Sequence, residues 1–131
     1  MTYDSHNIFA RILRGEIPCQ KVYEDEYVLA FHDIAAKAPV HVLVIPKGEY
    51  RDIADFGSRG TPEEITGFYR AVGKLANELG LSESGFRAIA NCGLNGGQEV
   101  PHFHTHLLGG RSLGPMLARE FSGQGGNLER E

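Results

Sequence analysis

The chain of 131 residues contains no tryptophan and only two cysteines, Cys19 and Cys92. The cysteines are far apart and belong to no paired motif, so free thiols in a reducing cytosol are expected. Long apolar runs are also missing. No stretch approaches the ~18 apolar residues that a membrane span requires, and the first residues lack the basic and apolar pattern of a signal peptide. We therefore expect a cytoplasmic protein without a membrane partner.

An excess of positive charge is missing as well. The chain has 13 lysines and arginines against 17 acidic residues, which gives a net charge of −4. Non-specific nucleic-acid binding requires a basic face, so no nucleic-acid partner is expected. A small phosphorylated ligand remains compatible with this charge, because one site needs only local hydrogen-bond donors.

The length and the 41% hydrophobic content indicate a single domain over residues 1–131, with enough apolar material for a core. The strongest helix signal begins at Thr61. Thr61 is the predicted cap, Pro62 occupies the first helical position, and Glu64 completes a capping box. An apolar stripe then continues at helical spacing to Leu79, and Gly80 is the predicted end.

Shorter periodic segments complete the prediction. A short helix is expected over residues 8–13, capped by Asp4 or Ser5, and a further helical turn around residues 52–56. Strands are predicted at residues 20–23, 27–32, 40–45, 86–90 and 102–108. Five strands with one long and one short helix indicate an α+β domain with a mostly antiparallel sheet. Residues 118–131 are expected to form a flexible tail.

Three histidines alternate with other residues in the segment His102-Phe103-His104-Thr105-His106. Alternate side chains of a strand face the same side, so the three imidazoles are predicted to line one face of a strand. Pro101 donates no ladder hydrogen bond and is expected at the start or edge of that strand. Two chemistries fit better than packing alone: three ligands for a catalytic zinc ion, or an imidazole that attacks phosphorus.

A glycine-rich loop over residues 91–101 runs directly into the histidines. Glycine allows backbone N–H groups to approach an anion closely. The sequence Gly96-Gly97-Gln98 before three aligned histidines therefore favours a phosphate held beside an imidazole.

Gly-Gly-Gln followed by His-x-His-x-His-Leu-Leu-Gly-Gly resembles the signature of the histidine triad (HIT) family of nucleotide hydrolases and transferases. The segments 14–18, 29–34 and 38–47 resemble its Hint branch, and the resemblance covers residues 8–111, the expected core of the domain. It implies a HIT-like fold. Hint-branch proteins are purine nucleoside phosphoramidases, typically homodimers whose sheets join into one, and no cofactor or metal is expected for such an enzyme.

The resemblance also implies roles for individual residues. His104 matches the nucleophile that attacks the α-phosphorus. His102 and His106 match the flanking histidines that position the phosphate and help to protonate the leaving amine. His41 matches a fourth histidine that supports the triad, and Asp33 matches the acid that binds the ribose hydroxyls.

The same resemblance implies two sets of substrate contacts. The walls of a purine pocket match Ile8, Phe9, Ile17, Phe31, His32 and Ile34. The phosphate contacts match Asn91, Gln98 and the backbone of Gly96 and Gly97. Glu99 stands where many eukaryotic members have a serine that touches the phosphate.

The leading hypothesis is a hydrolase that cleaves purine nucleoside 5′-phosphoramidates, and related acyl-adenylates, to a nucleoside monophosphate through a nucleotidyl-histidine intermediate. Within the family, the alternative is a dinucleoside polyphosphate hydrolase of the Fhit type. From other classes, a purine nucleotide-binding protein with little turnover and a zinc-dependent hydrolase remain alternatives. The zinc hypothesis predicts that a chelator abolishes activity.

Overall fold

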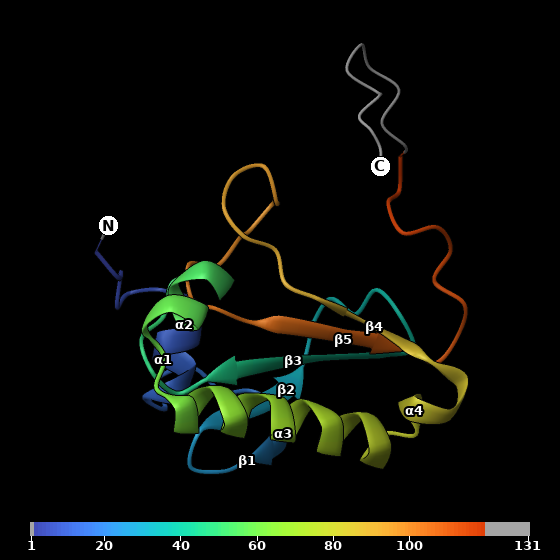
Figure 1. The fold of residues 1–131 in the computed structure, drawn as a ribbon, viewed down its shortest axis with the longest axis horizontal. Helices are drawn as coiled ribbons and strands as arrows, with labels where there is room; N and C mark the ends of the chain where they lie inside the picture. Colours follow the sequence, from blue (N-terminus) through green and yellow to red (C-terminus); the bar gives the residue numbers. More distant parts are fainter. Residues whose placement is uncertain (1, 120–131) are drawn as a thin grey trace.

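The computed structural model of the protein describes residues 2–119, so the predicted tail at 118–131 lies outside the described residues except for its first two positions. Four helices and five strands are found in this range (Figure 1). In chain order they are α1 (Ile8–Leu13), β1 (Lys21–Glu24), β2 (Val28–His32), β3 (Val40–Pro46), α2 (Ile53–Arg59), α3 (Pro62–Glu78), α4 (Leu81–Ser84), β4 (Phe86–Ile89) and β5 (Thr105–Gly109).

The strands form one sheet in the order β1-β2-β3-β5-β4, and every neighbouring pair is antiparallel. This confirms the predicted α+β class with an antiparallel five-stranded sheet. Of the four helices in the described residues, α1, α2 and α3 lie where helical segments were expected. The prediction did not include α4, which is a single turn between α3 and β4.

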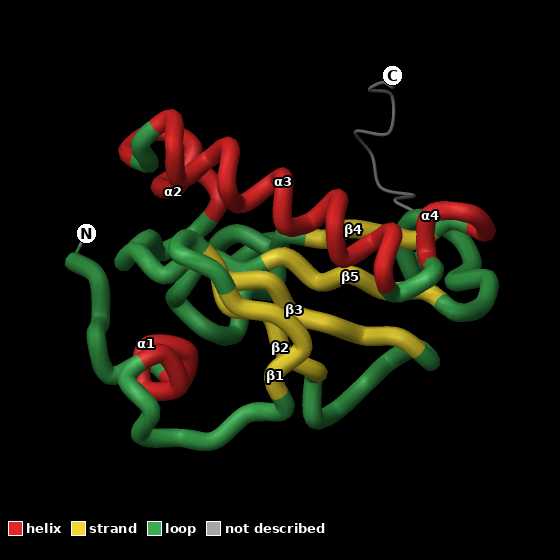
Figure 2. The backbone as a smooth tube through the Cα atoms, turned by 90° about the horizontal axis from the view of Figure 1, so that it is seen from below, coloured by secondary structure: helices red, strands yellow, loops and turns green. Residues whose placement is uncertain are grey.

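Helices cover both faces of the sheet, with α3 along one face and α1 against the other (Figure 2). Side chains alternate along the strands as the period of two requires. Val28 and Ala30 of β2 pack in the core beneath α3 with Phe68. The alternate residues of the same strand, Leu29 and Phe31, pack with Phe9 of α1 in a second cluster on the opposite face.

The capping box predicted for α3 is confirmed. The Thr61 side chain accepts a hydrogen bond from the Glu64 N–H, and the Glu64 carboxylate accepts one from the Thr61 N–H. The predicted cap of α1 is wrong, because Asn7 takes this position and its side chain accepts from the Ala10 N–H. Asp4 instead accepts the N–H of His6 in a local turn.

The histidine segment enters the sheet later than predicted. β5 begins at Thr105, so only His106 of the three histidines lies in the ladder. The reason is a competing acceptor: the Phe103 N–H donates to the carbonyl of Tyr50 at 2.7 Å. The predicted alternation nevertheless holds, since Phe103 and Leu107 pack beneath α3.

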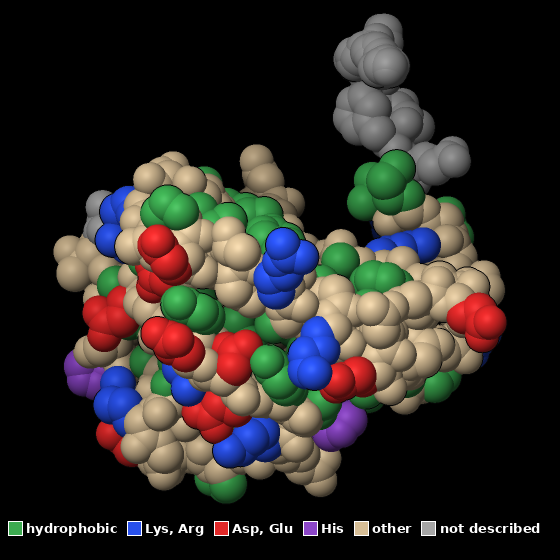
Figure 3. Space-filling view, turned by 60° about the horizontal axis from the view of Figure 1, so that its bottom comes forward, with side chains coloured by type: hydrophobic (Ala, Val, Ile, Leu, Met, Phe, Trp, Pro, Cys, Tyr) green, Lys and Arg blue, Asp and Glu red, His purple; other side chains and the backbone are tan. Residues whose placement is uncertain are grey.

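The surface agrees with the small net charge. On the face seen in Figure 3, acidic and basic side chains are interspersed, and no patch of one sign dominates. Among residues 2–119, no helix combines the length and apolarity that crossing a membrane requires.

Phe103 provides a test of the core beneath α3. Its ring is 1% exposed and stacks on Phe56 with a centroid distance of 5.0 Å. We expect Phe103→Ala to lower the free energy of unfolding by about 3–5 kcal/mol, because it leaves a cavity among aromatic rings. Urea denaturation measures the loss. Leu94→Ala, at a side chain that is 96% exposed, is the control, and equal losses for both would contradict this account of the core.

Candidate active site

A pocket of about 500 Å³ opens on the face of the sheet that carries α1. Much of its apolar wall comes from α1, β2 and the segment between α1 and β1, and Leu43, Ile89, Val100 and Leu108 complete it. Most of the residues predicted for the site line it: Ile8, Phe9, Ile17, Phe31, His32, Asp33, Ile34, His41, Asn91, Gly97, Glu99, His104 and His106. His102, Gly96 and Gln98 do not.

His104 presents a free lone pair to this pocket. Its Nδ1 lies 2.7 Å from the carbonyl oxygen of His102, and since a carbonyl only accepts, Nδ1 carries the proton. In the neutral ring Nε2 is then unprotonated, and no group within residues 2–119 forms a hydrogen bond with it. The ring of Phe9 packs edge-on against this imidazole at a centroid distance of 4.9 Å. The side chain is therefore held in place with an unpaired lone pair at Nε2.

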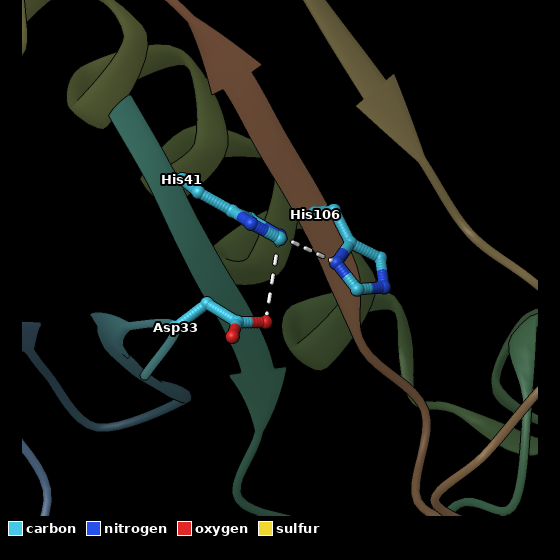
Figure 4. Close-up of side chains that lie close together, drawn as sticks. All are labelled: Asp33, His41 and His106. Carbon is cyan, nitrogen blue, oxygen red and sulfur yellow. Dashed lines mark hydrogen bonds and ion pairs between the residues drawn. The ribbon is translucent and has the colours of Figure 1, made fainter. Parts of the chain in front are cut away.

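A chain of hydrogen bonds sets the opposite tautomer in His106. The backbone N–H of Lys37 donates to Nδ1 of His41 at 3.1 Å, so Nε2 of His41 carries the proton. That proton is donated to Nδ1 of His106 at 2.9 Å (Figure 4). Nε2 of His106 therefore carries a proton and points away from His41. The pocket thus contains one imidazole acceptor, His104, beside one imidazole donor.

Register explains why these rings meet. In the pairing of β3 with β5, His41 lies opposite Leu108 and His106 lies opposite Leu43. The two histidines are diagonal neighbours on the α1 face, which is within reach of long or aromatic side chains. The ring centroids of His104 and His106 are 5.1 Å apart.

Asp33 follows β2 and approaches the same pair of rings. Its Oδ2 lies 3.5 Å from Nε2 of His41, and its Oδ1 accepts the N–H of Ala35 at 2.7 Å. Its side chain is 17% exposed, which leaves carboxylate surface for a ligand in the pocket. A carboxylate is a suitable acceptor for ligand hydroxyl groups.

His102 lies behind the pocket instead of in its wall. The side chain is fully buried, and both ring nitrogens are engaged. Nε2 donates to the carbonyl of Pro46 at 2.9 Å, and Nδ1 accepts from the Tyr3 hydroxyl at 2.6 Å. The backbone carbonyl of His102 is the group that reaches His104, so this residue acts on the pocket through its main chain.

The glycine-rich loop is held by its own hydrogen bonds. The N–H groups of Gly97 and Gln98 donate to Leu94 and Gly93 within the loop. The Gln98 side chain accepts from Gly93 and donates to the carbonyls of Arg51 and Val100. A side chain at Gly96 would collide with the carbonyl of Cys92, 2.4 Å from a Cβ atom there. In this structure Gly96 and Gln98 therefore shape the loop.

Burial keeps the four histidines uncharged near neutral pH. Desolvation lowers the pKa of His102 and of His106 to about 4, and it also lowers the pKa of His104 and of His41 below the usual 6.5. Nearby carboxylates of Asp33 and Glu99 oppose this effect at His104. The imidazole of His104 is thus uncharged, with its proton on Nδ1.

The donor atoms do not fit a metal ion well. Asp33, His41 and His106 place one donor atom each within 4.8 Å of one another. Metal binding at Nε2 of His41 would, however, displace the proton donated to His106 and leave Nδ1–H of His41 facing the Lys37 N–H. The three triad histidines are no better suited, because both nitrogens of His102 are already paired.

Three groups that bind the site histidines were not predicted from the sequence: the Tyr3 hydroxyl, the Pro46 carbonyl and the Lys37 N–H. Tyr3 lies 99 residues from the histidine that it contacts, and the other two are backbone atoms. No residue pattern signals such contacts.

Comparisons with known proteins identify the family to which the chain belongs. The HIT domain profile matches residues 14–113. An uncharacterised 13.2 kDa HIT-like protein of Azospirillum brasilense is 58% identical over 118 residues, covering 90% of this chain and 97% of that protein. The purine nucleoside phosphoramidase of Escherichia coli K12 is 45% identical over 114 residues, covering 86% and 94%.

Solved structures show the same fold. A HIT family hydrolase from Clostridium thermocellum superposes with a TM-score of 0.78 at 40% identity, covering 86% of this chain and 96% of that chain. A histidine triad protein from Clostridium difficile gives a TM-score of 0.76 at 42% identity, covering 87% and 98%. With its sequence and its fold in agreement, the chain belongs to the HIT domain family.

Proposed function

We propose that this protein is a nucleotide hydrolase that cleaves purine nucleoside 5′-phosphoramidates, and related acyl-adenylates, to a nucleoside monophosphate. One observation carries the proposal: His104, whose Nε2 has no hydrogen-bond partner among the described residues, lines the pocket beside the N–H donor of His106. The Escherichia coli relative named a purine nucleoside phosphoramidase, at 45% identity, supports the same activity.

The chemistry of the pocket wall suggests one orientation for a nucleotide. A flat base would pack on the apolar wall that includes Phe9 and Phe31. Asp33 would accept the ribose hydroxyls, since its side chain is partly exposed. This direction of the nucleoside brings the α-phosphate to His104 and His106. The Nε2 atoms of these two rings have no hydrogen-bond partner among the described residues.

The reaction then proceeds in two displacements at phosphorus. Nε2 of His104 forms a bond to the α-phosphorus while the phosphorus–nitrogen bond of the substrate breaks, and the nitrogen takes a proton from solvent and leaves as an amine; the second step returns one proton to solvent. Water next attacks phosphorus and releases His104. Summed over both steps, one water is consumed: its oxygen and one hydrogen go to the phosphate, and the amine carries the other hydrogen.

His106 and His102 have supporting roles in this scheme. Because His106 is uncharged, we assign to it a hydrogen bond to a phosphate oxygen instead of the delivery of a proton. His102 fixes Nδ1–H of His104 through its carbonyl and so fixes which nitrogen attacks. His104 gains a positive charge in the intermediate. The negative charge of the Asp33 carboxylate favours this charged form of the ring.

A homodimer with a joined sheet is part of the same proposal. The sheet ends at β1 and β4, and its edge strands offer backbone groups that another strand can pair with. Light scattering of the purified protein tests the dimer independently of activity.

Substitution of the nucleophile tests the proposed chemistry. We expect the wild type to release adenosine monophosphate from adenosine 5′-phosphoramidate, and His104→Ala to lose at least about 1,000-fold in kcat, because the covalent step is then impossible. His6→Ala, whose side chain is 91% exposed outside the pocket, is the control. A wild type that binds the nucleotide without turnover would identify a binding protein instead.

Chelation separates the imidazole nucleophile from a zinc hydrolase. We expect dialysis against a chelator to leave kcat/KM unchanged, because ring nitrogens of His41 and His102 are engaged in hydrogen bonds that a metal would displace. Metal content is measured on the same samples. Loss of turnover that added zinc restores would show that the histidines are metal ligands.

The pH dependence of kcat/KM tests the state of His104. Burial lowers its pKa, so the free base persists below pH 6.5 and is lost only as the pH falls through the lower folded-state value. We therefore expect the acid limb of the profile to lie below pH 6.5, after subtraction of uncatalysed hydrolysis. An acid limb centred above pH 6.5 would contradict a buried, uncharged nucleophile.

A further inference from the structure

The pocket contains a carboxylate that the proposed chemistry does not use. Glu99 lines the pocket and is exposed. Its side chain forms no hydrogen bond or ion pair with any other described residue. Asp33, the other carboxylate of the pocket, is engaged with the Ala35 N–H and lies 3.5 Å from His41. Glu99 therefore retains its full capacity to bind a cation.

The backbone under Glu99 is held in place. The side-chain amide of Gln98 donates hydrogen bonds to two carbonyls, that of Arg51, which is distant in the sequence, and that of Val100 in the segment that leads to His104. Val100, the next residue, packs against the cluster of Phe9 and Phe31. The backbone that carries the Glu99 side chain is consequently held at the rim of the pocket.

The negative charge of Glu99 affects His104, the proposed nucleophile. Glu99 acts electrostatically on His104, whose protonated form it favours. An α-phosphate bound at His104 would meet this negative charge, and repulsion between like charges disfavours binding. A positive charge on the substrate would reverse the sign of the interaction.

The direction of the nucleotide indicates which part of the substrate meets Glu99. The base wall is built from α1 and β2, and Asp33 follows β2, whereas Glu99 belongs to the loop before β5. In a nucleoside phosphoramidate the leaving group lies beyond phosphorus, on the side away from the base. The leaving group is therefore the part that extends toward the rim of the loop.

We propose that Glu99 selects leaving groups that carry a positive charge, so that the preferred substrates are nucleoside phosphoramidates of amines with a second, cationic group. This inference rests on the proposed function. Anionic leaving groups, which include the polyphosphates of dinucleoside polyphosphates, are disfavoured by the same carboxylate. Among the described residues that line the pocket, Lys37 is the one lysine or arginine, and its side chain is exposed.

Binding of three synthetic ligands tests the selection. The ligands are adenosine 5′-phosphoramidates with butyl chains on nitrogen that end in an ammonium, a hydroxyl or a carboxylate group. Dissociation constants are measured by calorimetry with His104→Ala, which cannot turn them over. We expect the ammonium ligand to bind roughly 2- to 5-fold more tightly than the hydroxyl ligand, the range of an exposed ion pair, and the carboxylate ligand to bind most weakly.

The second set of measurements uses His104→Ala/Glu99→Gln. This variant should bind all three ligands with similar affinity. His104→Ala/Glu83→Gln, which removes an exposed carboxylate outside the pocket, should retain the preference. Raising the salt concentration from about 0.05 to about 0.5 M should reduce the preference, because an exposed pair is screened. A preference that survives Glu99→Gln, or that is absent from the start, would overturn the proposal.

Turnover distinguishes this proposal from the proposed function. The ratio of kcat/KM for the ammonium and hydroxyl substrates should fall toward one in Glu99→Gln. An equal loss for both substrates would show that Glu99 assists the reaction itself and does not select the leaving group. If the wild type hydrolyses none of the three compounds, the proposed function fails, while the dissociation constants still decide the role of Glu99.

Discussion

The hydrogen bond from the Lys37 N–H to His41 determines the protonation of the neighbouring rings. A backbone N–H can only donate, so Nδ1 of His41 must accept, and the proton of His41 is then directed to His106. The carbonyl of His102 imposes the opposite order on His104. Two chemically identical imidazoles thus become one donor and one acceptor. The difference is set by main-chain atoms, which no side-chain substitution removes directly.

The alternation of the strands separates stability from chemistry. Along β3, Val42 and Val44 belong to the core beneath α3, while His41 faces α1. The aromatic cluster around Phe103 anchors the segment from the core side and leaves the opposite side for His102 and His104. A rigid sheet can therefore hold polar rings in a desolvated place, where their pKa values fall and the neutral forms persist.

Local signals in the sequence predicted much of this arrangement. The capping box of α3 and the strands β2 and β3 depend on neighbouring residues, and all three were found close to their predicted positions. The prediction was wrong where a group distant in the sequence forms a hydrogen bond with the segment. The Tyr50 carbonyl delays the start of β5, and the Tyr3 hydroxyl helps to hold His102 outside the pocket. Such contacts join segments tens of residues apart, and periodicity carries no information about them.

The contact between Tyr3 and His102 also gives the site an optical signal of its own. The chain has no tryptophan, so its ultraviolet emission comes from five tyrosines, all of which lie in the described part of the chain. Tyr3 is the one whose hydroxyl is bonded to a histidine of the triad. Tyrosine emission responds to a proton acceptor at its hydroxyl group. A displacement or a protonation of His102 is thereby coupled to the fluorescence of a protein that carries no label.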